Sequence, residues 1–98
     1  MGLKATRKAV IEKLKEGTIQ HELDRKGRID EKNFLAVGRV SVDEVIEFLQ
    51  ATKGDEYEES DHHSVKDVTV SEFKPYGGGW YIKCYLIEPD VWFISVHK

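Results

Sequence analysis

The sequence predicts an α+β fold in which N-terminal helices pack on a three-stranded, or slightly larger, antiparallel sheet. Helical periodicity occupies the first half of the chain, and strand-like alternation occupies the second half. The clearest alternation lies in Trp80 to Lys98, where two runs rich in β-branched and aromatic residues flank Glu88-Pro89-Asp90. A chain of 98 residues can build one modest hydrophobic core, so we expect a single domain over residues 1–98.

Helices are expected in three places before the sheet. The first covers residues 3–16 and is followed by a glycine that can end it. A short second helix should follow Asp30, which can cap it, and run through residues 31–40. The third covers residues 41–54, because Ser41 and Glu44 have the spacing of a capping box. The apolar stripe of this third helix should pack across the sheet and contains Val42, Val45, Ile46 and Leu49.

Strands are expected at residues 65–73 and in the final hairpin. In the hairpin, a three-residue loop would bring two apolar sets onto the core face. Those sets are Ile82, Cys84 and Leu86 from the first strand and Trp92, Ile94 and Val96 from the second. The same register sets Tyr81 opposite His97 and Lys83 opposite Ser95.

Charge is unevenly distributed along the chain, although the net charge is only -3. Residues 1–28 hold eight Lys/Arg against four Asp/Glu, whereas residues 29–61 hold three against ten. Within the second segment, we expect residues 55–61 to form a solvated acidic loop. The net charge argues against a generic nucleic-acid binder, but the basic segment and the neutral sheet could share an RNA surface. The alternative is that these charges only solvate helix faces.

The sequence lacks the patterns typical of membrane proteins, disulfide-bonded proteins and metal-binding proteins. No apolar run is long enough to span a bilayer, and the N-terminus lacks the apolar core of a signal peptide, so we expect a soluble cytoplasmic protein without a membrane partner. The single Cys84 excludes an internal disulfide and is expected to be a small buried hydrophobe. Zinc-site and EF-hand spacings are missing, so we expect no metal and no cofactor. The adjacent His62 and His63 should point to opposite sides of an extended segment.

The hairpin face opposite the predicted core carries Tyr81, Lys83, Tyr85, Ser95 and His97. An aromatic platform, a cation and an imidazole side by side suit a single-stranded nucleic acid, because bases stack on aromatic rings and phosphates attract cations. An ordinary solvated sheet face would have a similar composition. The pattern alone does not decide between the two.

Four short blocks in the second half of the chain point to a known family. They are Asp61-His62, Lys66-Asp67-Val68, Tyr81-Ile82-Lys83, and Asp90-Val91 leading to Ser95 and a basic C-terminus. In these blocks and their spacing, the chain resembles the motility quorum-sensing regulator (MqsR) toxins, which are bacterial type II toxin–antitoxin endoribonucleases. The resemblance implies a RelE-like toxin fold and metal-independent cleavage of single-stranded mRNA. It also implies a cognate antitoxin, itself a DNA-binding protein, that holds the toxin inactive.

The resemblance also implies a catalytic set and an RNA-binding set. Tyr81 matches the family's active-site tyrosine, and Lys83 matches the adjacent lysine. Lys66 stands where the family has a glutamine, and His97 stands near its C-terminal lysine. The RNA-binding residues expected beside this catalytic set are Lys53, His62, Tyr85 and Lys98.

The chemistry of RNA cleavage is consistent with these residue types. Without a metal, the 2′-hydroxyl must be activated, the departing 5′-oxygen protonated, and the charge of the phosphorane neutralised. Histidine changes charge near neutral pH, so His97 could act as the base or the acid. Lys66 and Lys83 would hold the phosphate. A tyrosine with the ordinary pKa of about 10 is a poor base at neutral pH, so Tyr81 would position the substrate or donate a proton.

Two other functions also fit the sequence. One is a non-catalytic module that binds RNA or a protein. The other is a toxin of the RelE/ParE superfamily that acts on the ribosome or on DNA gyrase. Cleavage of naked RNA would favour the ribonuclease, whereas a requirement for ribosomes or gyrase would favour the last alternative.

Overall fold

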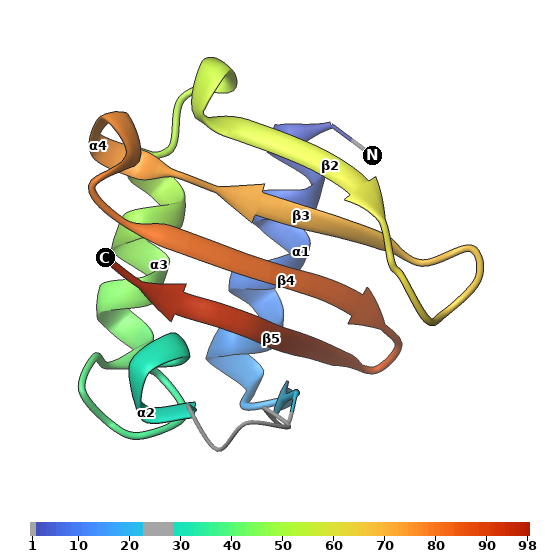
Figure 1. Ribbon diagram of the computed structural model, residues 1–98, viewed down its shortest axis with the longest axis horizontal. Coiled ribbons are helices and arrows are strands. Elements are labelled where there is room, and N and C mark those ends of the chain that lie inside the picture. The colour runs from blue at the N-terminus through green and yellow to red at the C-terminus, as the bar shows by residue number, and fades with distance from the viewer. Residues whose placement is uncertain (1, 23–28) are drawn as a thin grey trace.

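Within residues 2–22 and 29–98, which the computed structural model describes, the chain forms a five-stranded mixed sheet with two long helices against one face (Figure 1). The sheet order is β1-β5-β4-β3-β2, with β1 parallel to β5 and the other neighbours antiparallel. The α+β class is as predicted, but the sheet is larger than three strands and is not purely antiparallel. The strands are β1 (Ile19–His21), β2 (Tyr57–Asp61), β3 (Thr69–Phe73), β4 (Tyr81–Ile87) and β5 (Asp90–His97).

The first long helix, α1 (Leu3–Glu16), has the predicted bounds. It ends at Gly17, whose φ of 80° is a left-handed conformation that glycine adopts without a Cβ clash. Near this end Lys13 is buried, and its ammonium lies 2.9 Å from the Glu88 carboxylate and 3.0 Å from the Pro89 carbonyl oxygen. Lys13 therefore fastens α1 to the β4–β5 turn.

The second long helix, α3 (Val42–Ala51), begins at the predicted capping box. The Ser41 hydroxyl accepts from the Glu44 N–H, and the Glu44 carboxylate accepts from the Ser41 N–H. The helix ends before Thr52 rather than at residue 54, because Thr52 adopts an extended conformation. The Arg7 guanidinium of α1 donates to the Thr52 carbonyl oxygen at 3.0 Å, which satisfies a carbonyl that the ended helix leaves without a partner.

The remaining helices are single turns: α2 (Ile29–Lys32), the 3₁₀ turn η1 (Gly54–Glu56) and α4 (Pro75–Gly78). The helix predicted over residues 31–40 is therefore much shorter than expected, and Asp30 lies inside its single turn and does not cap it. It ends where Asn33 pairs with Val96 beside β5, and the buried Asn33 side chain accepts from the Ala36 N–H.

β1 and β2 are the two strands that the sequence did not predict, and both lie at edges of the sheet. β2 occupies most of the acidic segment that was expected to be a loop, and four of its five side chains are exposed. An edge strand pairs on one side only and needs no buried face, so it tolerates charged residues. The predicted strand at residues 65–73 is correct only from Thr69 onward, because residues 62–68 connect β2 to β3.

The final hairpin has the predicted pairing at its open end, but a different geometry produces it. Ile87 pairs with Asp90, so the loop has two residues rather than the expected three. Further along, Lys83 pairs with Ser95 while Cys84 pairs with Phe93, which makes Ile94 the extra residue of a β-bulge. The bulge restores the register that the shorter loop would have shifted. Tyr81 therefore lies opposite His97, as predicted.

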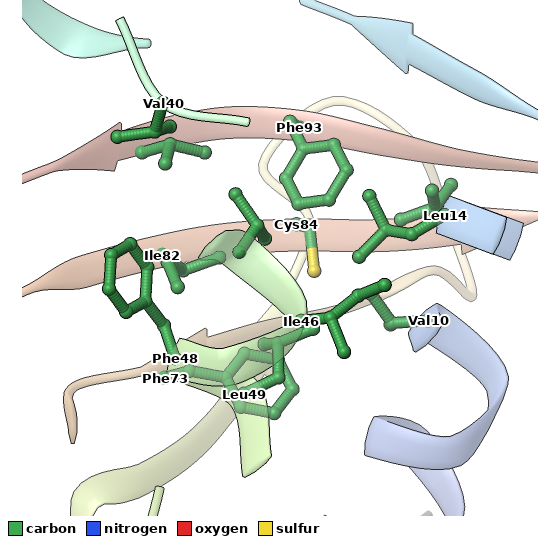
Figure 2. Packing of buried hydrophobic residues seen from close by; sticks show 13 residues of the cluster. Val10, Leu14, Val40, Ile46, Phe48, Leu49, Phe73, Ile82, Cys84 and Phe93 are labelled. Atoms are coloured by element: carbon green, nitrogen blue, oxygen red, sulfur yellow. The ribbon is translucent and has the colours of Figure 1, made fainter. Parts of the chain in front are cut away.

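The bulge also decides which side chains of β5 enter the core. Val91, Phe93 and Val96 are fully buried, whereas Trp92 and Ile94 are only partly buried. The predicted core positions of Trp92 and Ile94 are therefore wrong, and that of Val96 is correct. Figure 2 shows the resulting cluster, in which sheet residues meet α1 and α3; its labelled members are Val10, Leu14, Val40, Ile46, Phe48, Leu49, Phe73, Ile82, Cys84 and Phe93.

Cys84 lies fully buried within this cluster (Figure 2). Burial raises the pKa of its thiol to about 12, because the surrounding apolar side chains do not solvate a thiolate. Cys84 therefore acts as the small buried hydrophobe that the sequence predicts.

Candidate functional site on the open face of the sheet

The face of the sheet opposite α1 and α3 carries no helix in the described part of the chain, and it points toward the viewer in Figure 1. We call it the open face. The basic helix α1 lies on the other side of the sheet, so it does not share a surface with the open face as the charge distribution had suggested. The open face is lined by Val70 and Glu72 of β3, Tyr81, Lys83 and Tyr85 of β4, and Trp92, Ser95 and His97 of β5.

Tyr81 and His97 lie side by side at one end of the open face. Their ring centroids are 5.3 Å apart and the rings are nearly perpendicular, at 75°. The Tyr81 hydroxyl donates a hydrogen bond to the carboxylate of Glu72 on the neighbouring strand. Burial, and then this hydrogen bond to a carboxylate, raise the pKa of Tyr81 well above its usual value. Tyr81 therefore keeps its proton at neutral pH and serves as a hydrogen-bond donor.

The tautomer of His97 follows from its backbone contact. Its Nδ1 lies 2.8 Å from the carbonyl oxygen of Lys98, and a carbonyl oxygen only accepts. Nδ1 therefore carries the proton of the neutral ring, and Nε2 carries the lone pair. A neutral imidazole with this arrangement can accept a proton at Nε2.

One lysine lies near this pair on the open face. Lys83 is two residues from Tyr81 on the same face of β4, between Glu72 of β3 and Ser95 of β5. The ammonium of Lys98 lies 5.6 Å from the ring centre of Trp80, and Trp80 stacks on Phe48 of α3, so this cation–π contact is on the helix side of the sheet. The Tyr81 end of the open face thus combines a hydroxyl donor, a proton acceptor and the cation of Lys83.

A second cluster occupies the other end of the open face. Glu22, which follows β1, accepts from Nε2 of His62, which follows β2, at 3.1 Å. One contact thus joins segments that leave the two opposite edges of the sheet. The Tyr85 hydroxyl bonds to the same carboxylate, and burial, then this bond, raise the pKa of Tyr85. Tyr85 is only 5% exposed, so it is covered rather than presented to solvent as a stacking platform.

The structure brings together only part of the catalytic set taken from the family. Tyr81, Lys83 and His97 lie together. Lys66 lies in the β2–β3 connection, at the far end of β4 from Tyr81 (Figure 1). The four residues of strand from Tyr81 to Tyr85 alone span about 13 Å.

The predicted RNA-binding residues are also divided. Lys98 follows His97, but its ammonium lies over Trp80 on the helix side of the sheet. His62 and Tyr85 lie at the end of the open face away from Tyr81. Lys53 is exposed at the start of η1, which leads into the edge strand β2.

The two adjacent histidines do not point to opposite sides as expected. Their rings stack, with centroids 4.8 Å apart and an angle of 12°. β2 ends at Asp61, so His62 and His63 lie outside the extended backbone on which the prediction depended. The Nδ1 atom of His62 accepts from the backbone N–H groups of Ser64 and Val65, which shapes this turn.

Sequence reasoning missed Glu72 and Glu22. Glu72 had a detectable signal, because alternation in the predicted strand places it on the face opposite the apolar Phe73. Glu22 had none, since its role depends on a contact between segments 40 residues apart in the chain.

A cavity of about 170 Å³ lies on the helix-covered side of the sheet, not on the open face. Val10 and Thr6 of α1 and Cys84 of β4 contribute to its lining. Its position excludes it as an extension of the Tyr81–His97 cluster.

Comparison with protein-family models, with curated proteins and with solved structures gives no match to this chain. The similarity to the MqsR toxins therefore stays a prediction from the residue blocks. Among the described residues, no helix is long and apolar enough to cross a lipid bilayer. The same residues contain no group of three or more His, Cys, Asp or Glu side chains that could hold a metal ion.

Proposed function

We propose that this protein is an endoribonuclease that cleaves single-stranded mRNA without a metal, as the MqsR toxins that it resembles do. The observation that carries the proposal is the pairing of Tyr81 with His97 on the open face, with Lys83 on the same face of β4. These three side chains supply the proton donor, the proton acceptor and the positive charge that the reaction requires.

In the proposed reaction, Nε2 of His97 takes the proton of the 2′-hydroxyl. The 2′-oxygen then attacks the adjacent phosphorus, and the bond from phosphorus to the 5′-oxygen breaks. Tyr81 gives its proton to the departing 5′-oxygen, and both side chains exchange protons with water afterwards. The products are a 2′,3′-cyclic phosphate and a 5′-hydroxyl. Lys83 stabilises the negative charge that develops on the phosphate.

Glu72 would hold the Tyr81 hydroxyl in place before RNA arrives. Its hydrogen bond fixes the orientation of the phenol, and the negative charge keeps the phenol protonated. The alkoxide that leaves is a much stronger base than tyrosinate, so a protonated phenol with a raised pKa can still transfer its proton to it.

The same arrangement favours one alternative, a module that binds RNA or a protein without cleaving it. The Tyr81 hydroxyl already donates its hydrogen bond to the Glu72 carboxylate, and Glu58 adds further negative charge near it. If RNA does not displace this hydrogen bond, the open face would bind but not react.

The resemblance to the MqsR toxins also leads us to propose a protein partner and a cellular compartment. A toxin that cleaves mRNA acts in the cytoplasm, and a co-encoded DNA-binding antitoxin would hold it inactive. Purification together with a small protein encoded by a neighbouring gene would support this part of the proposal.

The test is incubation of the purified protein with a long single-stranded RNA in EDTA, followed by mapping of the new ends. We expect cleavage at defined sites that leaves 2′,3′-cyclic phosphates. A folded protein that leaves naked RNA intact would refute the proposed activity. Cleavage that appears only when ribosomes are added would instead identify a ribosome-dependent toxin.

A further inference from the structure

Four aromatic rings form a continuous row at the end of the open face that the proposed reaction does not use. The row runs from His63 and His62 in the β2–β3 connection through Tyr85 of β4 to Trp92 of β5. His63 stacks on His62, and His62 meets Tyr85 edge-on, with ring centroids 4.7 Å apart and an angle of 84°. Tyr85 and Trp92 are parallel within 3°, with ring centroids 6.2 Å apart.

Polar contacts hold the two inner rings in place. Two backbone N–H groups donate to Nδ1 of His62, so its Nε2 carries the proton and donates to Glu22. The Tyr85 hydroxyl donates to the same carboxylate. The side chain of His62 is 4% exposed and Tyr85 is 5% exposed, so neither ring is available to a ligand.

The two outer rings are the accessible ones. His63 is exposed, and Trp92 is partly exposed although it lies in the middle of the sheet. Because the inner rings support them, the outer rings would lose little conformational freedom when a flat ligand stacks on them. Charged residues near this end are Glu22, Asp61, Asp67 and Asp90, together with the exposed Lys66 of the same connection.

We propose that Trp92 is a second subsite that binds an unpaired nucleobase by stacking. This inference rests on the proposed function, since the base would belong to the RNA strand whose phosphate reacts at Tyr81 and His97. Lys83 lies between the two ends of the face on β4, where it can meet the phosphate backbone that joins them. Stacking on an aromatic ring is the usual way in which proteins bind single-stranded RNA.

The occupant is a single-stranded nucleic acid rather than an apolar peptide for two reasons. The accessible surface is the flat ring of Trp92 rather than a groove. Trp92 also lies on the same face of β4 and β5 as Lys83 and the Tyr81–His97 pair. If the row only covered the sheet, its outer rings could be changed without affecting RNA binding.

The experiment measures the affinity of the protein for a fluorescently labelled single-stranded RNA with 2′-O-methyl groups, which cannot be cleaved. We expect Trp92→Ala to weaken binding by about 5-fold to 150-fold, the range for loss of one stacked base. Trp92→Phe should retain most of the affinity. The matched control is Tyr76→Ala, which removes an exposed aromatic ring that packs against Phe48 on the helix side.

A second measurement does not depend on how well Trp92→Ala folds. The chain has two tryptophans, so Trp80→Phe leaves Trp92 as the single tryptophan fluorophore. Its emission should be quenched as the RNA binds. If the wild type binds and cleaves RNA while Trp92→Ala binds equally well and Trp92 is not quenched, the subsite is refuted and the ribonuclease stands. If the wild type neither binds nor cleaves RNA, the proposed function fails, and the subsite fails with it.

Discussion

Tyr81 and His97 face each other across β4 and β5, with ring centroids 5.3 Å apart, at the end of the sheet where β4 begins and β5 ends. Each ring is held by a different partner. Glu72 accepts from the Tyr81 hydroxyl, and the Lys98 carbonyl accepts from Nδ1 of His97. The pair therefore presents one protonated donor and one proton acceptor to the same region of the open face.

The two lysines taken from the family resemblance should behave differently. Lys83 lies beside Tyr81, so Lys83→Ala should lower kcat for RNA cleavage by about 10²-fold, as loss of one charge-stabilising donor does. Lys66 lies at the other end of the sheet, so Lys66→Ala should change KM and leave kcat near that of the wild type. Steady-state kinetics on a short RNA measure both constants. A drop in kcat for Lys66→Ala as large as that for Lys83→Ala would contradict this placement.

Glu72→Gln should lower the pKa of Tyr81 toward that of an ordinary tyrosine. A nearby negative charge disfavours tyrosinate, so removal of that charge makes ionisation of Tyr81 easier. Spectrophotometric titration at alkaline pH should show one tyrosine that ionises at lower pH than in the wild type. The shifted signal should disappear in the double variant with Tyr81→Phe. Identical titration curves for Glu72→Gln and the wild type would show that Glu72 does not act on Tyr81.

The Glu22–His62 contact should make stability sensitive to acid. Burial raises the pKa of Glu22. Hydrogen bonds with Tyr85 and His62 together lower it by more than burial raises it, so the pKa lies below the ordinary 4.5. A folded-state pKa below the unfolded value stabilises the protein above about pH 4.5, and this stabilisation is lost as the pH falls through the folded-state pKa.

The measurement is the free energy of unfolding from urea titrations at several pH values. Glu22→Gln should be less stable than the wild type at neutral pH, and its stability should fall less steeply below pH 4.5. Glu12→Gln, on the exposed side of α1, is the matched control and should follow the wild type. Parallel pH curves for Glu22→Gln and the wild type would refute the role of this contact.

The β-bulge predicts which hydrophobic side chains of β5 stabilise the fold. Phe93 is fully buried, so Phe93→Ala should lower the free energy of unfolding by about 3–5 kcal/mol. Ile94 is the bulged residue and is only partly buried, so Ile94→Ala should lower it by about 1 kcal/mol. Chemical denaturation of both variants measures the difference. A larger loss for Ile94→Ala than for Phe93→Ala would restore the simple alternation and refute the bulge.

The hairpin shows why a correct prediction can follow from an incorrect detail. A three-residue loop without a bulge and a two-residue loop with one extra residue give the same pairing of Tyr81 with His97. Alternation beyond the bulge differs between the two, and for that reason Trp92 and Ile94 were assigned to the wrong environment. A single sequence does not reveal a bulge, because Ile94 has the same strand propensity in both arrangements.

The long helices could be predicted from local sequence signals, whereas the edge strands could not. α1 and α3 carry local signals, a terminal glycine and a capping box, so their positions could be predicted closely. After Tyr57, β2 carries four exposed acidic or polar side chains in a row, and only its pairing with β3 makes it a strand. The contact between Glu22 and His62 is longer in range still, and only the folded sheet brings its two partners together.

The most direct test of the central claim compares two tyrosine substitutions in one cleavage assay with EDTA. Tyr57 is the matched control, because its hydroxyl also bonds a glutamate, Glu59, but lies beside Ser71 on the helix side of the sheet. If the open face is the active site, Tyr81→Phe should lower kcat by about 10²–10⁴-fold, and Tyr57→Phe should cleave RNA about as fast as the wild type. Wild-type cleavage rates for Tyr81→Phe would contradict the account.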